Sequence, residues 1–208
     1  MRHASSLCAA GLILGLGAVG CTSASSGASP AVPGSQRYPG GSAPAASPLP
    51  AAAGVYKSVP RACPALSPAA LRAIAPGSAS GTETDSSSGG VVEHVCDWHA
   101  EGSAWSRTVT VMIELDPGTA GPANAAGAYQ NALSYAPGPP SAIPGLGTRA
   151  QLNEARTKAG SSAQLHVLRR NAIITVAYVG TDSGAPMTAA EMRNGPVTAA
   201  RSVVAALR

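Results

Sequence analysis

Two cysteines and two histidines of this chain have the residue types of a zinc site. Cys96 lies between His94 and His99, and Cys63 precedes them by roughly thirty residues. Zn²⁺ in structural sites prefers cysteine and histidine ligands. On a strand, however, His94 and Cys96 share one face while His99 points to the other. We therefore expect no metal and no other cofactor, and we predict a Cys63–Cys96 disulfide, the default for two cysteines in an oxidising compartment.

Candidate catalytic groups are few. A serine with His166 and Asp182 would supply the residue types of a hydrolase, but the chain has neither a G-x-S-x-G elbow nor an S-x-x-K motif. Glu114 and Asp116 share a strand face about 7 Å apart, a spacing that loosely suits an inverting glycosidase. They run directly into a Pro-Gly turn, which favours a structural role. Trp105 is a candidate contact residue, although packing in a hairpin is the simpler role. We predict that the protein is not an enzyme.

The N-terminus reads MRHASSLCAAGLILGLGAVGC and is typical of a bacterial export signal. Arg2 precedes an apolar run that is too short to span a bilayer comfortably. Small residues immediately before Cys21 resemble the lipobox of bacterial lipoproteins, in which that cysteine receives a diacylglyceryl group. Two or more acyl chains give the stable anchoring that one chain cannot. We predict cleavage of the signal peptide 1–20, lipidation of Cys21, and attachment to the outer face of the cytoplasmic membrane.

Residues 21–58, here called the tether, are rich in Ser, Ala, Gly and Pro. Such a composition buries too little apolar surface to offset the entropy of ordering, so we expect a disordered segment. The remaining residues, 59–208, should form a single domain. The net charge is +4, yet the only pair of adjacent basic residues in that region is Arg169-Arg170, without interleaved aromatic residues. This pattern argues against a nucleic-acid partner.

Alternating patterns predict two β-hairpins. The clearest strand is 107–115, where valine, isoleucine and leucine alternate with polar residues, and it should pair with 92–98. A second hairpin should join 164–169 to 172–179. The latter run is apolar on both faces, which favours a central strand. A short strand is expected at 149–153, and Gly/Ser- or Pro/Gly-rich loops at 77–90 and 136–147.

Helices are expected in three places. Ser67 suits the N-cap and Pro68 the first position of a short helix that Pro76-Gly77 should end. A second helix should span about 122–135. Thr188 to Glu191 form a capping-box pattern, and the helix they begin should be interrupted at Gly195-Pro196. Hairpins with helices between them predict an α+β fold, an antiparallel sheet with helices packed on one face.

Three segments of the predicted domain follow one another in a recognisable order and spacing. They are Cys63-Pro64-Ala65-Leu66, Cys96-Asp97-Trp98 and the run from Ile143 to Ala150. Together they resemble an actinobacterial lipoprotein family known as domain of unknown function 3558. The first is similar to the segment that opens the family's domain, and the second to a later Cys-x-Trp. The third looks like the family's Gly-Leu-Gly-Asp-x-Ala segment, with Thr148 where aspartate is usual. The resemblance covers about residues 59–208. It implies a secreted, lipid-anchored α+β domain and brings no catalytic residues, because the family has no established activity.

These observations favour a non-catalytic module of the cell envelope that binds a lipid, a cell-wall ligand or an envelope protein. Two alternatives stay open. One is an accessory or structural lipoprotein bound to another membrane protein, and the other is a cell-wall-directed hydrolase. A binding module should have a groove or apolar patch, whereas a hydrolase should have a pocket in which an acid, histidine or serine pair converges.

Overall fold

The structure is a computed structural model that describes residues 54–158, 160–182 and 185–208 of the 208-residue chain. The predicted signal peptide, Cys21 and all but the last residues of the tether lie outside these ranges. Within them, no helix is both long enough and apolar enough to cross a membrane.

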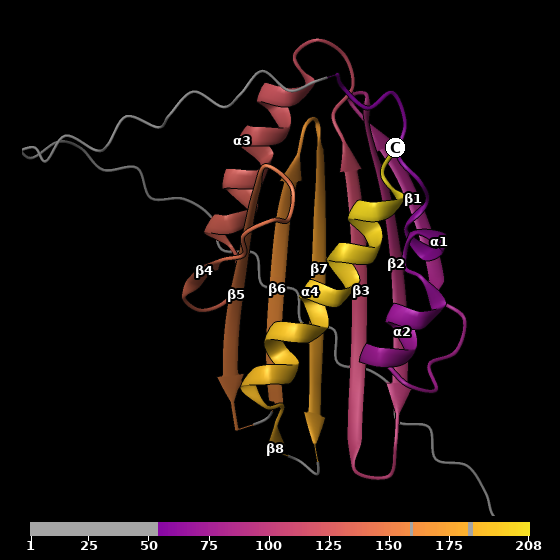
Figure 1. The fold of residues 1–208 in the computed structure, drawn as a ribbon, viewed down its shortest axis with the longest axis vertical. Coiled ribbons are helices and arrows are strands. Elements are labelled where there is room, and N and C mark those ends of the chain that lie inside the picture. The colour runs from indigo at the N-terminus through magenta and orange to yellow at the C-terminus, as the bar shows by residue number, and fades with distance from the viewer. Residues whose placement is uncertain (1–53, 159, 183–184) are drawn as a thin grey trace, which may run out of the picture. The chain divides into compact units, whose positions relative to one another are not determined.

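The described residues form one antiparallel sheet with four helices, which confirms the predicted α+β class (Figure 1). Seven strands lie in the order β1-β2-β3-β7-β6-β5-β4, and the two-residue strand β8 pairs with β7. The strands are β1 (Thr82–Ser88), β2 (Val91–Glu101), β3 (Trp105–Leu115), β4 (Pro140–Ala142), β5 (Arg149–Thr157), β6 (Gly160–Arg169), β7 (Ala172–Asp182) and β8 (Ala185–Pro186).

Both predicted hairpins are present. Strands β2 and β3 pair from Val92–Leu115 to Glu101–Ser106, and β6 and β7 turn at Arg170-Asn171. Strand β7 lies between β3 and β6, as its apolar residues on both faces predict. Strand β3 buries Val109, Val111, Ile113 and Leu115, the alternate residues that point to one face.

Three helices cover one face of the sheet, which we call the helical face. They are α1 (Ala62–Ala65), α2 (Pro68–Ile74) and α4 (Ala189–Ala206). In Figure 1, α4 crosses in front of the central strands, and α1 and α2 lie in front of β2. The fourth helix, α3 (Gly121–Ser134), packs against the opposite face, where Tyr129 meets Leu168 and Ile173 in a separate small cluster. Among the described residues, no other helix packs on that opposite face.

Helix α4 runs without a break through Gly195-Pro196, so the predicted interruption there is wrong. Proline removes one backbone hydrogen bond from a helix interior. Here both residues are buried, and the glycine lets the helix approach the ring of Tyr178 closely. Packing against β7 therefore offsets the cost of the proline. The capping box at the start of α4 is confirmed, since Thr188 and Glu191 exchange both hydrogen bonds.

The loop predicted at 77–90 is also wrong in part, because residues 82–88 form the edge strand β1. Five of its seven residues are Glu, Asp or Ser, which have weak strand preferences. Pairing with β2 along all seven residues supplies the hydrogen bonds that the composition does not predict. Similarly, the predicted tether includes Tyr56, but this residue is buried in the core. The folded region therefore begins before Val59.

Candidate functional site

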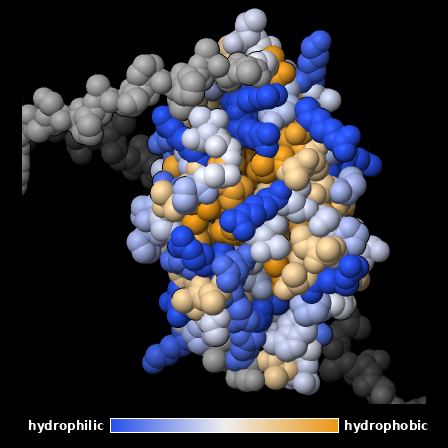
Figure 2. Space-filling model, viewed as in Figure 1, coloured by the Kyte–Doolittle hydropathy of each residue, from blue (hydrophilic) through white to orange (hydrophobic). Residues whose placement is uncertain are grey.

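A cleft of about 470 Å³ opens on the helical face, between the end of α2 and the first turns of α4. Strands β3 and β7 form its floor. The volume falls in the range of small-molecule sites. Its lining residues are Ala73, Ile74, Pro76, Trp105, Arg107, Tyr178, Asp182, Ala190, Glu191, Asn194, Gly195 and Thr198. In Figure 2, the helical face shows apolar surface near its centre, bordered by hydrophilic side chains.

Arg107 is the polar centre of this cleft, and its side chain is only 7% exposed. It occupies a position on β3 whose side chain points to the same face as Val109 and Val111. Its Nη2 atom donates to Asp182 Oδ1 at 2.6 Å and to Glu191 Oε1 at 2.9 Å. One guanidinium thus joins the end of β7 to the first turn of α4.

The remaining donors of Arg107 are also used. Nε donates to the Tyr178 hydroxyl at 3.1 Å, and Nη1 donates to the carbonyls of Ser106 and Thr181 at 2.8 and 2.7 Å. Burial would lower the pKa of Arg107, but the hydrogen bonds that it donates to Asp182 and Glu191 outweigh the effect of burial, and the pKa is raised. The guanidinium is therefore a permanently charged structural link between strands and helix.

Glu191 has two roles. Its Oε2 atom accepts from the Thr188 hydroxyl at 2.7 Å and from the Thr188 backbone N–H at 2.9 Å, which caps α4. Its Oε1 atom accepts from Arg107. The hydrogen bond from Thr188, followed by those from the Thr188 backbone and Arg107, lowers the pKa of Glu191 despite partial burial. The carboxylate at this wall of the cleft is therefore held ionised.

Trp105, at the start of β3, lines the cleft beside Arg107. The guanidinium carbon lies 5.7 Å from the centre of the indole ring, within cation–π range. The indole ring also packs so closely over Gly102 that a Cβ added to this glycine would overlap the ring. The expectation that Trp105 packs in the hairpin is therefore met, and the same ring also forms a wall of the cleft.

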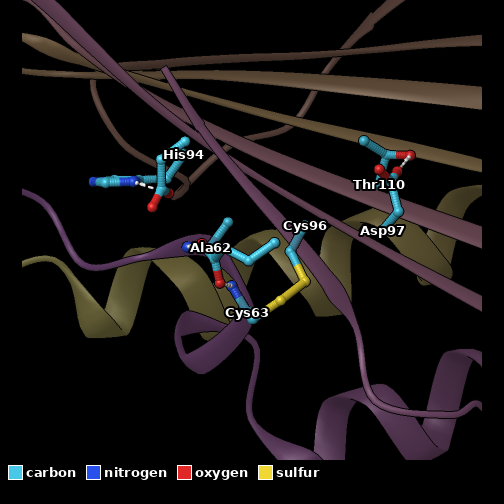
Figure 3. Close-up of a disulfide and its surroundings, with 8 residues drawn as sticks. Ala62, Cys63, His94, Cys96, Asp97 and Thr110 are labelled. Atoms are coloured by element: carbon cyan, nitrogen blue, oxygen red, sulfur yellow. Dashed lines mark hydrogen bonds and ion pairs between the residues drawn. A yellow bond between two sulfur atoms is a disulfide. The ribbon is translucent and has the colours of Figure 1, made fainter. Parts of the chain in front are cut away.

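The predicted cysteine pair is confirmed. The sulfur atoms of Cys63 and Cys96 lie at disulfide distance, with their Cα atoms 5.2 Å apart (Figure 3). The bond joins α1 to β2. Trp98 lies beside it, because a Cβ built on Gly81 would contact both the Cys96 sulfur and the Trp98 ring.

The two histidines of the zinc hypothesis do not join these cysteines. His94 lies on the helical face, with its Nδ1 atom 2.6 Å from Asp85 Oδ1. His99 lies on the opposite face, where it forms hydrogen bonds with the side chains of Thr108 and Glu101. Glu83, Asp85 and His94 do lie near one another. The Glu83 carboxylate, however, accepts from the backbone N–H groups of Ala62 and Cys63, and Arg61 pairs with Asp85. Protein groups therefore satisfy these carboxylates.

The groups of the hydrolase hypothesis are separated by the sheet. His166 lies on β6 with its side chain on the face opposite α4, whereas Asp182 points into the cleft on the helical face. His166 is buried, and its Nδ1 atom lies 3.1 Å from the Thr175 hydroxyl. Desolvation lowers its pKa, so the imidazole is neutral. A catalytic triad of these residues is excluded by geometry.

Glu114 and Asp116 stand at the far end of β3 from the cleft. Burial raises the pKa of Asp116, while burial, Asp116 and the directly opposite Glu93 raise that of Glu114. Asp116 is buried, and its Oδ2 atom has no hydrogen-bond partner among the described residues. Neither residue lines the cleft, which opens at the other end of β3.

Sequence reasoning missed Arg107, Glu191 and Tyr178 as a group. The sequence contains one signal of this group, because the charged Arg107 stands in line with the alternating apolar residues that point to one face of its strand. Its partners are not local, since they lie 75 and 84 residues away. Comparison of the chain with protein-family models, curated proteins and solved structures finds no match. The resemblance drawn from the sequence thus stays a prediction.

Proposed function

We propose that this protein is a lipid-anchored, extracytoplasmic binding module without catalytic activity, and that its ligand occupies the cleft at Arg107. The observation that supports this best is the cleft itself. It is of ligand size, has apolar walls, and contains a few polar groups fixed by an extended hydrogen-bond network. Rigid polar groups in an apolar cleft favour binding over chemistry, because they orient a ligand without supplying a mobile proton.

The alternative of a cell-wall hydrolase finds less support. A glycosidase needs one carboxylic acid with a raised pKa to protonate the leaving group. In the cleft, the pKa of Glu191 is lowered instead, and Arg107 forms ion pairs with both Glu191 and Asp182. No histidine or cysteine lines the cleft. The nearest arrangement to an acid–base pair is therefore an ion-pair cluster.

Native mass spectrometry of the full-length lipoprotein, solubilised in detergent from its host's envelope, tests the binding role. We expect the wild type to retain a bound molecule, seen as a mass beyond that of the protein and its lipid anchor. In Ala190→Trp, the indole would fill the cleft, because Ala190 is exposed and lines it. The control is Ala189→Trp, which adds the same side chain at the neighbouring exposed helix position outside the lining.

The expected pattern is an extra mass on the wild type and on Ala189→Trp, and its loss from Ala190→Trp. A bare wild type, or equal loading of all three proteins, would contradict the cleft as the ligand site. A bare protein that crosslinks in cells to a second envelope protein would instead favour the accessory or structural alternative.

The predicted anchor is tested separately. With Cys21 as the lipidated residue, the purified wild type should carry the mass of acyl chains on an N-terminal cysteine, and Cys21→Ser should carry none. Globomycin, which blocks the lipoprotein signal peptidase, should cause uncleaved precursor to accumulate. Normal cleavage in its presence would refute lipidation but would leave the binding proposal intact.

A further inference from the structure

Arg107 has no donor left for a ligand. An arginine carries five N–H bonds, and in Arg107 all five meet acceptors within the protein, on Tyr178, Ser106, Thr181, Asp182 and Glu191. A phosphate, sulfate or carboxylate entering the cleft would therefore have to displace bonds that hold β7 to α4. The positive residue at the centre of the cleft is not an anion site.

The charge that remains in the cleft is negative. One guanidinium stands against the carboxylates of Asp182 and Glu191, and no other charged residue is among the lining residues. The side chains of Asp182 and Glu191 are 37% and 40% exposed, so they contact solvent in the cleft. At a partly buried position, an unbalanced charge is screened less than on an open surface.

Acceptor oxygens remain free beside this charge. Oδ2 of Asp182 has no hydrogen bond with any described residue, and neither has the side chain of Asn194. Both therefore offer the cleft an acceptor oxygen, and the amide of Asn194 also has N–H donors free. Opposite them, Ala73, Ile74 and Pro76 form an apolar wall. A ligand that complements these surfaces donates hydrogen bonds at one end and is apolar at the other.

We propose that the cleft binds an organic amine, as a primary or secondary ammonium on an apolar body. Its N–H groups donate to Asp182 Oδ2 and the Asn194 amide oxygen, and its body packs on the wall formed by the end of α2. This inference rests on the proposed ligand-binding function. The same chemistry is available from a soluble amine or from an aminolipid headgroup, and both fit these contacts.

A set of three probes separates the contribution of charge from that of shape. 2-Phenylethylamine, 2-phenylethanol and 3-phenylpropionate share a similar apolar body and carry a positive, a neutral and a negative end. Binding to the full-length protein is followed by chemical-shift changes at the Trp105 indole N–H. We expect the amine to bind at least tenfold more tightly than the other two, with an affinity that falls as salt is added.

Asp182→Asn removes the free carboxylate oxygen but keeps an acceptor for Arg107, and it should reduce amine binding about tenfold. Asp97→Asn makes the same change in net charge on the opposite face of the sheet and should leave binding unchanged. If the protein binds the anion or the alcohol as tightly as the amine, the amine inference is overturned, while the cleft remains a ligand site. Failure of all three probes to bind would overturn it as well.

The envelope-derived ligand distinguishes the two sources. A retained mass that reacts with an amine-specific reagent and extracts into organic solvent identifies an aminolipid, and one that stays in water identifies a soluble amine. A retained mass without an amine would contradict the inference and still support the binding function. An absent mass, together with no difference between Ala190→Trp and Ala189→Trp, would refute the binding function itself.

Discussion

Asn171 binds the backbone of Tyr56 with both ends of its side-chain amide. Oδ1 accepts from the Tyr56 N–H at 2.7 Å, and Nδ2 donates to the Tyr56 carbonyl at 3.0 Å and to the Asp116 carbonyl at 2.7 Å. Asn171 is fully buried in the turn between β6 and β7. The turn therefore fixes the start of the folded region. It lies at the end of β7 opposite the cleft residue Asp182.

Asn171→Ala should lower the free energy of unfolding by about 2–4 kcal/mol, because it leaves buried backbone groups without partners. Urea denaturation measures the loss, and hydrogen exchange should show that the Tyr56 N–H loses protection. Asn194→Ala removes the same side chain from an exposed position and should cost less than about 0.5 kcal/mol. Equal stabilities of the two variants would contradict the role of Asn171.

Two helical glycines should respond in opposite directions to substitution by alanine. Gly127 is exposed in α3 with nothing near an added Cβ, so Gly127→Ala should stabilise by about 0.5–1 kcal/mol. At Gly195 in α4, the Cβ would lie 2.5 Å from Tyr178 Cε1, and Gly195→Ala should destabilise by about 1–3 kcal/mol. Thermal unfolding measures both. Stabilisation by both changes would show that α4 does not pack this closely on β7.

Glu114→Gln should increase stability at neutral pH by roughly 0.5–1 kcal/mol, because Glu114 stands directly opposite Glu93 on a partly buried face. Burial and its acidic neighbours raise the pKa of Glu114 in the folded protein. Ionisation is thus easier in the unfolded chain, and the destabilisation develops as the pH rises above about 4.5. The benefit of Gln should vanish near pH 3. Exposed Glu101 gives the control Glu101→Gln, and a gain that persists at pH 3 would rule out an electrostatic cause.

His166 should make the protein sensitive to mild acid. Burial lowers the pKa of its imidazole in the folded state, and its Nε2 atom has no hydrogen-bond partner among the described residues. The unfolded chain therefore takes up a proton near pH 6.5 while the folded protein does not. Stability from this residue is present above pH 6.5 and is lost as the pH falls below it.

His166→Gln should remove that part of the pH dependence between pH 7 and 5, at whatever cost in absolute stability. Urea denaturation at several pH values measures it. His99→Gln, at an exposed histidine on the same face, should leave the slope as in the wild type. An unchanged slope in His166→Gln would mean that other groups cause the acid sensitivity.

The oxidised domain should weigh two hydrogens less than its reduced form and should be more stable. Closing a 33-residue separation contributes about 3–4 kcal/mol in the chain-entropy model. Denaturation with and without a reductant measures the difference, and the double variant Cys63→Ala, Cys96→Ala should match the reduced wild type. Two free thiols in the native purified protein would contradict the bond.

Local patterns in the sequence determined much of the fold. Alternation of apolar and polar residues is a property of neighbouring positions, and it located β3 and the central position of β7. Capping is equally local, and Ser67 and Thr188 begin their helices where the sequence predicts. The disulfide followed from the number of cysteines left after the predicted leader and lipid anchor are removed.

Only the tertiary structure decided what depends on which strand lies beside which. Strand β1 exists because β2 pairs with it, against the preferences of most of its own residues. His166 and Asp182 are a candidate pair in the sequence, yet the register between β6 and β7 places them on opposite faces. The cleft has the same origin, because Arg107, Asp182 and Glu191 meet only once β3, β7 and α4 have packed. A contact between residues far apart in the chain leaves no local pattern, and so the sequence alone identified the strand of Arg107 but not its partners.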